Sequence, residues 1–171
     1  MPLRLCEVDA RLAPLCRQFE SETVSIADLD GLAIPVILKE NFLNEPEAKL
    51  SAVIASDQAF YRLSQRSIFI NDSTFWSLPE KVTTAVLAHE VGHAVSHRDG
   101  LEARAPFAEL SRCQVADLLA CRWGFYEALR EERAAYYGES YAEALALWPD
   151  ENAFARAMAR WRMQRLAGLK G

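Results

Sequence analysis

Apolar and polar positions alternate in the first half of the chain, and this pattern predicts β-strands. In "RSIFIND" (66–72), Ile68 and Ile70 fall on one face and Phe69 on the other, which is the period-two pattern of a half-buried strand. Further runs have strand-like composition: "AIPVILKE" at 33–40, "LSAVIAS" at 50–56, and a strand–turn continuation at 56–65. The short links between these runs favour an antiparallel meander.

Helical periodicity surrounds these runs. Residues 3–28 form an amphipathic pattern shaped by Pro14, and they predict a helix. A second helix is predicted to begin at a capping box formed by Ser77 and Glu80, and to end at the turn residues "DG" at 99–100.

The second half of the chain predicts more helices. Ser111 is a suitable N-cap for a helix over 112–130. The remainder is helical in pattern, with breaks at Gly138 and at "WPDE" (148–151). In the run "REERA" (130–134) the charges indicate a solvated helix face.

These elements together predict the α+β class. A length of 171 residues suits one domain, 1–171. We expect a three-stranded, mostly antiparallel sheet packed on two helices within 30–125, and additional helices over 126–171.

Composition excludes some functions. The net charge of -5 and the sequence pI of about 5.3 provide no basic footprint for direct binding of nucleic acid. The longest apolar runs, such as 31–38, are too short to cross a bilayer. No signal-peptide pattern opens the chain, so we expect a cytoplasmic protein without a membrane partner.

The four cysteines form no C-x-x-C pair, so free thiols or metal ligands are expected.

The stretch "AVLAHEVGHAVSH" (85–97) carries the strongest chemical signal. His89 and His93 lie one helical turn apart on the same face, so both imidazoles can reach one metal ion. Glu90 lies beside them, where a carboxylate can act on a water molecule at that metal. The pattern predicts a Zn²⁺ site.

A third ligand is needed, and His97 is poorly placed to be it. His97 lies about 12 Å along a straight helix from His89, too far for one ion. Cys113 and Asp117 share a face of the next predicted helix, and either can reach the metal. A neighbouring stripe of small residues would let that helix approach Gly92 closely: Ala116, Ala120 and Gly124.

The segment "VTTAVLAHEVGHAVSH", followed by a helix carrying "AD..A", resembles the ImmA/IrrE-like zinc peptidases. The resemblance covers roughly 30–125 and implies a small zincin-like domain. It also implies that "IFIND" before the metal helix is the edge strand along which an extended substrate would pair.

One departure concerns the ligand set. Aligning Ala116 and Asp117 with the family motif places Cys113 where the family has a ligand glutamate. The resemblance therefore predicts His89, His93 and Cys113 as metal ligands. Asp117 is an alternative ligand, or a proton acceptor behind a ligand histidine. Three more residues are candidates for the third ligand: Glu102, Glu109 and His97.

The resemblance implies a zinc metallopeptidase in which Glu90 activates a metal-bound water. The expected partner is a protein or peptide substrate, such as a regulatory protein.

Two further hypotheses stay open. One is a non-catalytic zinc module closed by four protein ligands. The second is a small-amide hydrolase resembling peptide deformylases, which also combine two such histidines with a cysteine. The sequence does not select the oligomeric state, or an oxyanion donor among Tyr126, Tyr136, Tyr137 and Tyr141.

Overall fold

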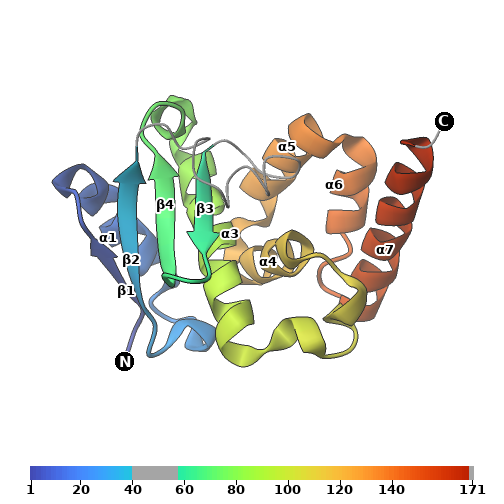
Figure 1. Cartoon of the computed structure of the whole chain (residues 1–171), viewed down its shortest axis with the longest axis horizontal. Helices are drawn as coiled ribbons and strands as arrows, with labels where there is room; N and C mark the ends of the chain where they lie inside the picture. Colours follow the sequence, from blue (N-terminus) through green and yellow to red (C-terminus); the bar gives the residue numbers. More distant parts are fainter. Residues whose placement is uncertain (40–57, 170–171) are drawn as a thin grey trace.

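A computed structural model describes residues 1–39 and 58–169. The fold is α+β, as predicted, with a sheet on one side and a group of helices on the other (Figure 1). The described sheet has four strands in the order β1-β2-β4-β3. Their bounds are Arg4–Glu7 for β1, Ala33–Lys39 for β2, Ala59–Arg62 for β3 and Ser67–Asn71 for β4.

The predicted sheet of three mostly antiparallel strands is wrong. Strand β2 runs parallel to both β1 and β4, and β3 alone pairs in the antiparallel direction. The alternation of side chains shows that a segment is a strand, but it carries no information about the direction of its partner. The predicted strand at 50–56 lies outside the described residues.

The position of "IFIND" also differs from the prediction. This segment is β4, which lies between β2 and β3, and β3 ends the described sheet. The alternation predicted for β4 is confirmed. Ile68 and Ile70 point into the main core, while Phe69 stacks on Phe60 on the other face, with 5.3 Å between the ring centroids.

The helix predicted over 3–28 is wrong at its start. Residues Arg4–Glu7 form β1, and the helix α1 covers only Ala13–Thr23. Leu3 and Leu5 are both buried, so the first residues alternate like a strand. Over so short a stretch this alternation fits a helical pattern as well, and pairing with β2 decides between the two.

The helices that follow the sheet are α3 (Glu80–Asp99), α4 (Arg112–Ala120), α5 (Tyr126–Tyr137), α6 (Glu139–Leu145) and α7 (Glu151–Gly168). Helix α3 lies between the sheet and the other helices, as Figure 1 shows. It contacts β3 on one side and both α4 and α5 on the other. The residues of α3 therefore lie where the two halves of the molecule meet.

The observed ends of α3 and α4 can be compared with the capping residues predicted from the sequence. The capping box at Ser77 is wrong, because α3 begins after Pro79 and the Ser77 hydroxyl donates to the Thr74 carbonyl instead. The stop is confirmed at Gly100, which has the left-handed φ of 62° that glycine adopts readily. Ser111 does cap α4.

The helix predicted over 112–130 is interrupted. A π-helical turn, Cys121–Phe125, separates α4 from α5, and Gly124 within it has a φ of 97°. A side chain at that φ would be strained, so the glycine permits the change of direction. As a result, α5 folds back beside α4 and α3. The break predicted at Gly138 is confirmed.

Helices α3 and α4 cross at Gly92. A Cβ atom added there would lie 2.9 Å from the Ala116 carbonyl oxygen and 3.0 Å from its Cα. The close approach predicted from the small residues is therefore present, and it brings the two helices to the distance that a shared site requires.

Replacing Gly92 with alanine is expected to reduce the free energy of unfolding by about 1–3 kcal/mol, because the added methyl group forces α3 and α4 apart. Gly168→Ala in α7 is the control, since a Cβ there meets nothing within 4 Å. Urea denaturation of both variants measures the difference. Equal stability of Gly92→Ala and Gly168→Ala would contradict the tight crossing.

Candidate metal centre

Helices α3 and α4 bring together three side chains with metal-binding atoms. The Nε2 atoms of His89 and His93 are 3.1 Å apart, and the Cys113 Sγ lies 3.9 Å from the His93 Nε2. All three candidate ligand atoms lie within 4.8 Å of one another. This is the trio that the sequence predicted, and its assembly depends on the crossing at Gly92.

The trio fits a zinc ion. Tetrahedral zinc with ordinary Zn–N and Zn–S bonds separates two nitrogen ligands by about 3.3 Å, and a nitrogen from a sulfur by about 3.6 Å. The His89–His93 and His93–Cys113 distances of 3.1 and 3.9 Å are close to these values, and the third pair lies within 4.8 Å. Rotation of the Cys113 side chain toward the histidines would bring all three atoms to one ion. Two imidazoles and a thiolate are also ligands that zinc prefers.

The two ligand histidines differ in protonation, and His93 is the one already in the neutral form that a metal requires. Burial, and then the neighbouring His89, hold the pKa of His93 well below its usual value, so its imidazole is neutral, as a ligand must be. Burial also opposes charge on His89, but the carboxylate of Asp117 raises its pKa to about 10. Without a metal this imidazole is therefore protonated at neutral pH, and a metal bound at Nε2 would displace that proton. The Asp117 Oδ1 lies 2.6 Å from the His89 Nδ1. This contact places a proton on Nδ1 and directs Nε2 toward the other ligands.

Asp117 therefore occupies the position of a proton acceptor behind His89. Its carboxylate is completely buried, and both oxygens have partners. Arg133 contacts them through Nε and Nη2 at 2.9–3.2 Å, and the Tyr141 hydroxyl donates to Oδ2 at 2.6 Å. Although burial alone would raise the pKa of Asp117, Arg133 and His89 lower it, so the carboxylate is ionised.

The sequence did not predict a role for Arg133 in the site, and it offered Tyr141 only as one of four candidate oxyanion donors, not as a partner of Asp117. The prediction of a solvated face over 130–134 is wrong for Arg133, which is 5% exposed. A signal was present, because Leu129, Arg133 and Tyr137 recur every four residues and so share one helix face. An arginine on the same face as a buried leucine indicates a buried ion pair.

Glu90 lies on the other side of the trio, next to β3. Its Oε1 is 4.0 Å from the His89 Nε2, and the backbone N–H of Tyr61 donates a hydrogen bond to the carboxylate. Burial raises the pKa of Glu90, while His89 and the Tyr61 N–H act in the opposite direction. Its Oε2 is one of the few buried side-chain oxygens in the described part of the chain that have no hydrogen-bond partner.

The remaining candidates for the third ligand lie elsewhere. His97 and Glu109 are exposed, and Glu102 pairs with Arg112 at 3.0 Å. Within residues 1–39 and 58–169, no other group of three or more His, Cys, Asp or Glu side chains has metal-binding geometry. Among the tyrosines, Tyr141 is already bonded to Asp117.

The cysteines are expected to differ in reactivity. Burial raises the pKa of Cys16 to about 12 and raises the pKa of Cys121 further, so neither thiol ionises readily. Cys113 is only half-buried.

We expect iodoacetamide to modify Cys113 of the metal-free native protein well before Cys16 or Cys121, and zinc to slow this reaction. Peptide mass spectrometry over time measures the rates, and an unprotected Cys113 in the presence of zinc would contradict its role as a ligand.

No protein-family model, curated protein or solved structure matches this chain. The similarity to ImmA/IrrE-like peptidases thus rests on the residues of the two helices and stays a prediction. Across residues 1–39 and 58–169, no helix combines the length and the apolar character needed to cross a membrane.

Proposed function

We propose that this protein is a zinc-dependent peptidase in which His89, His93 and Cys113 hold the metal and Glu90 is the general base. The observation that carries this proposal is the buried, unpartnered Oε2 of Glu90 beside the three ligand atoms. Burying a carboxylate oxygen without a partner costs about 1–3 kcal/mol. A purely structural metal site has no need of such a group, whereas a hydrolase requires it to accept a proton.

A zinc ion bound by these residues would polarise the scissile carbonyl and make water more acidic. Glu90 then accepts a proton from the attacking water and transfers it to the leaving amine. Burial raises the pKa of Glu90 above its usual value, which makes this carboxylate a better proton acceptor than an exposed glutamate. Asp117 keeps His89 in the orientation that presents Nε2.

The position of Asp117 favours catalysis over a closed structural site. A closed site would need a fourth protein ligand, and Asp117 was the candidate. Its oxygens instead contact His89, Arg133 and Tyr141, so three protein ligands leave one coordination position for water or substrate.

The test is cleavage of a proteome-derived peptide pool by the zinc-loaded protein, with new peptide termini identified by mass spectrometry. We expect new termini that disappear when zinc is chelated and return when zinc is added back. His97→Ala is the matched control, since His97 is exposed on the same helix, and it should cleave like the wild type. No zinc-dependent termini from the wild type would overturn the proposal.

A further inference from the structure

Helix α7 places an arginine on an aromatic cluster next to the candidate metal centre. Trp161, Tyr137 and Tyr141 pack together, with ring centroids 4.8–5.7 Å apart. The guanidinium of Arg165 lies over two of these rings, 5.1 Å from the centroid of Trp161 and 5.5 Å from that of Tyr137. Stacking of this kind holds a guanidinium in place and leaves the N–H groups at its edge available.

The cluster is linked to the metal centre through Asp117. Tyr141 belongs to it and donates to Asp117, which in turn contacts His89. The guanidinium of Arg133 lies 5.8 Å from the Tyr137 ring. Burial raises the pKa of Tyr137, Arg133 opposes this, and Cys113 and Asp117 add to it, as expected for neighbouring groups. Arg165 is thus connected to the ligand His89 through the aromatic cluster and Asp117.

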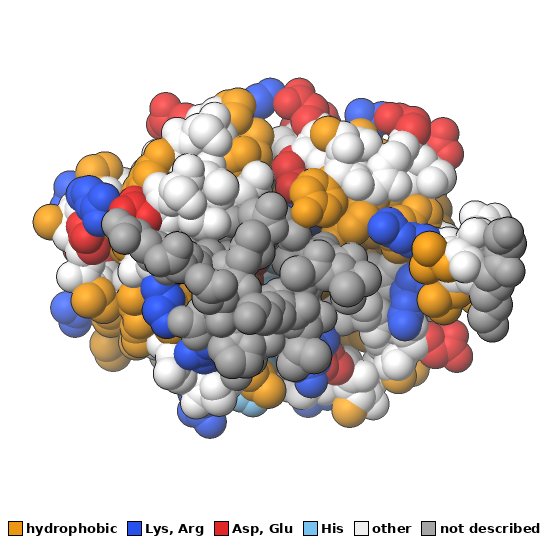
Figure 2. All heavy atoms as spheres, turned by 45° about the horizontal axis from the view of Figure 1, so that its top comes forward, with side chains coloured by type: hydrophobic (Ala, Val, Ile, Leu, Met, Phe, Trp, Pro, Cys, Tyr) orange, Lys and Arg blue, Asp and Glu red, His pale blue; other side chains and the backbone are white. Residues whose placement is uncertain are grey.

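Arg165 is exposed, and none of the ion pairs in the described part of the chain involves it. Its surroundings are also basic, although the whole chain carries a net charge of -5. Helix α7 contains a single acid, Glu151, and several basic residues: Arg156, Arg160, Arg162 and Arg165. Figure 2 shows Lys and Arg side chains on the right-hand side of the molecule, where α7 lies in Figure 1.

We propose that Arg165, held against Trp161 and Tyr137, binds a carboxylate of the peptide substrate beside the metal centre. A guanidinium fixed in one plane can form two parallel hydrogen bonds with a carboxylate, and less conformational entropy is lost because the side chain is already ordered. The carboxylate is either a side chain of Asp or Glu or the C-terminus of the peptide. The inference rests on the proposed function, because it assigns a substrate class to the same site.

The experiment measures binding rather than cleavage, using the zinc-loaded Glu90→Gln variant. Three rhodamine-labelled decapeptide pools serve as probes in fluorescence polarisation: neutral peptides with an amidated C-terminus, the same peptides with a free C-terminal carboxylate, and amidated peptides with one internal glutamate. We expect at least one carboxylate-bearing pool to bind about tenfold more tightly than the neutral pool. The pool that shows the gain identifies the source of the carboxylate.

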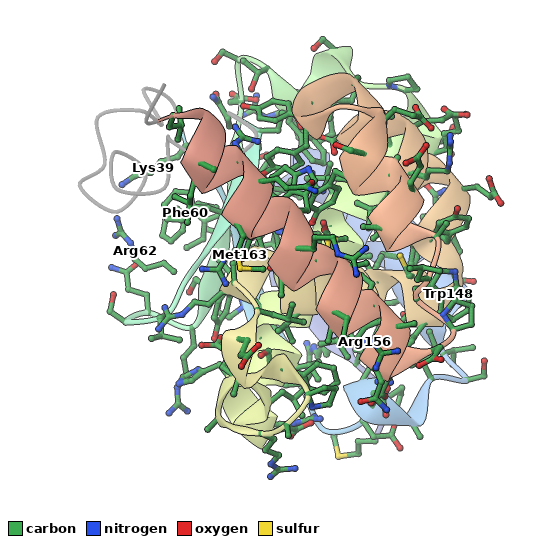
Figure 3. The ribbon with its side chains drawn as sticks, turned by 90° about the vertical axis from the view of Figure 1, so that its right-hand side faces the viewer. Lys39, Phe60, Arg62, Trp148, Arg156 and Met163 are labelled. Atoms are coloured by element: carbon green, nitrogen blue, oxygen red, sulfur yellow. The ribbon has the colours of Figure 1, made fainter. Side chains whose placement is uncertain are left out.

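Substitutions assign this gain to Arg165. Arg165→Ala should abolish it, and Arg165→Lys should retain only part, because lysine keeps the charge but not the planar fork. Arg156→Ala is the control. Arg156 lies in the first half of α7, away from Phe60 and Arg62 of the sheet (Figure 3), and its removal should leave the gain unchanged.

Equal binding of all three pools, or a gain that survives Arg165→Ala, would overturn the inference. Circular dichroism confirms that each variant is folded. Because binding is measured without turnover, failure of this inference is distinct from failure of the wild type to cleave peptides.

Discussion

Replacement of Arg133 by methionine is expected to reduce the free energy of unfolding by about 3–5 kcal/mol, because it leaves a buried carboxylate without its main counter-charge. Arg133 and Asp117 are almost completely buried, at 6% and 0% side-chain exposure. After the substitution, Asp117 would retain only the contacts with His89 and Tyr141. For a chain of this length, such a loss lowers the melting temperature by about 10 °C. Thermal denaturation of the metal-free protein measures it.

Arg130→Met is the matched control on the same helix. Arg130 pairs with Glu139 at the surface, and such pairs contribute about 0–1 kcal/mol. The double variant Asp117→Asn/Arg133→Met removes both charges and should be more stable than Arg133→Met alone. If Arg133→Met and Arg130→Met were equally stable, Arg133 would not be the counter-charge of a buried Asp117.

Substituting Glu90 with glutamine is expected to lower the rate of peptide cleavage by about 10²–10⁴-fold while zinc remains bound. Glutamine has nearly the same shape, and it can still accept the hydrogen bond from the Tyr61 backbone. It cannot take up a proton from water. The zinc content and the cleavage rate, measured on the same preparation, separate loss of the base from loss of the metal.

Glu131→Gln is the control for this prediction, because Glu131 is an exposed acid that pairs with Lys81 on the surface. Its cleavage rate should equal that of the wild type. If Glu90→Gln cleaved peptides at the wild-type rate with zinc bound, Glu90 would not be the general base, and the mechanism proposed for this site would be wrong.

The parts of the site that could be predicted depend on local geometry. The spacing of His89 and His93, the position of Glu90 between them and the placement of Cys113 early in a capped helix all follow from helical periodicity. Gly92 and the small residues of α4 predicted a close helix crossing, and a Cβ at Gly92 would indeed collide with Ala116. Each of these inferences uses the spacing of residues within a helix, and the crossing combines Gly92 of α3 with the small residues of α4.

The rest depends on contacts between distant segments. The parallel pairing of β2 with β1 and β4 joins residues that no short-range pattern connects. The role of Arg133 depends on the turn at Gly124, which brings α5 back beside α4. The charged run around Arg133 resembles an ordinary surface helix, and the partner that buries it lies in another helix.

The central claim is that His89, His93 and Cys113 form one zinc site. The most direct measurement is elemental analysis of zinc per chain in purified wild type, Cys113→Ala and Cys6→Ala, where Cys6 is also partly exposed but lies in β1. We predict about one zinc ion per chain in wild type and Cys6→Ala, and loss of most of it in Cys113→Ala. Equal zinc in Cys113→Ala and wild type, or no zinc in any of the three, would contradict the account.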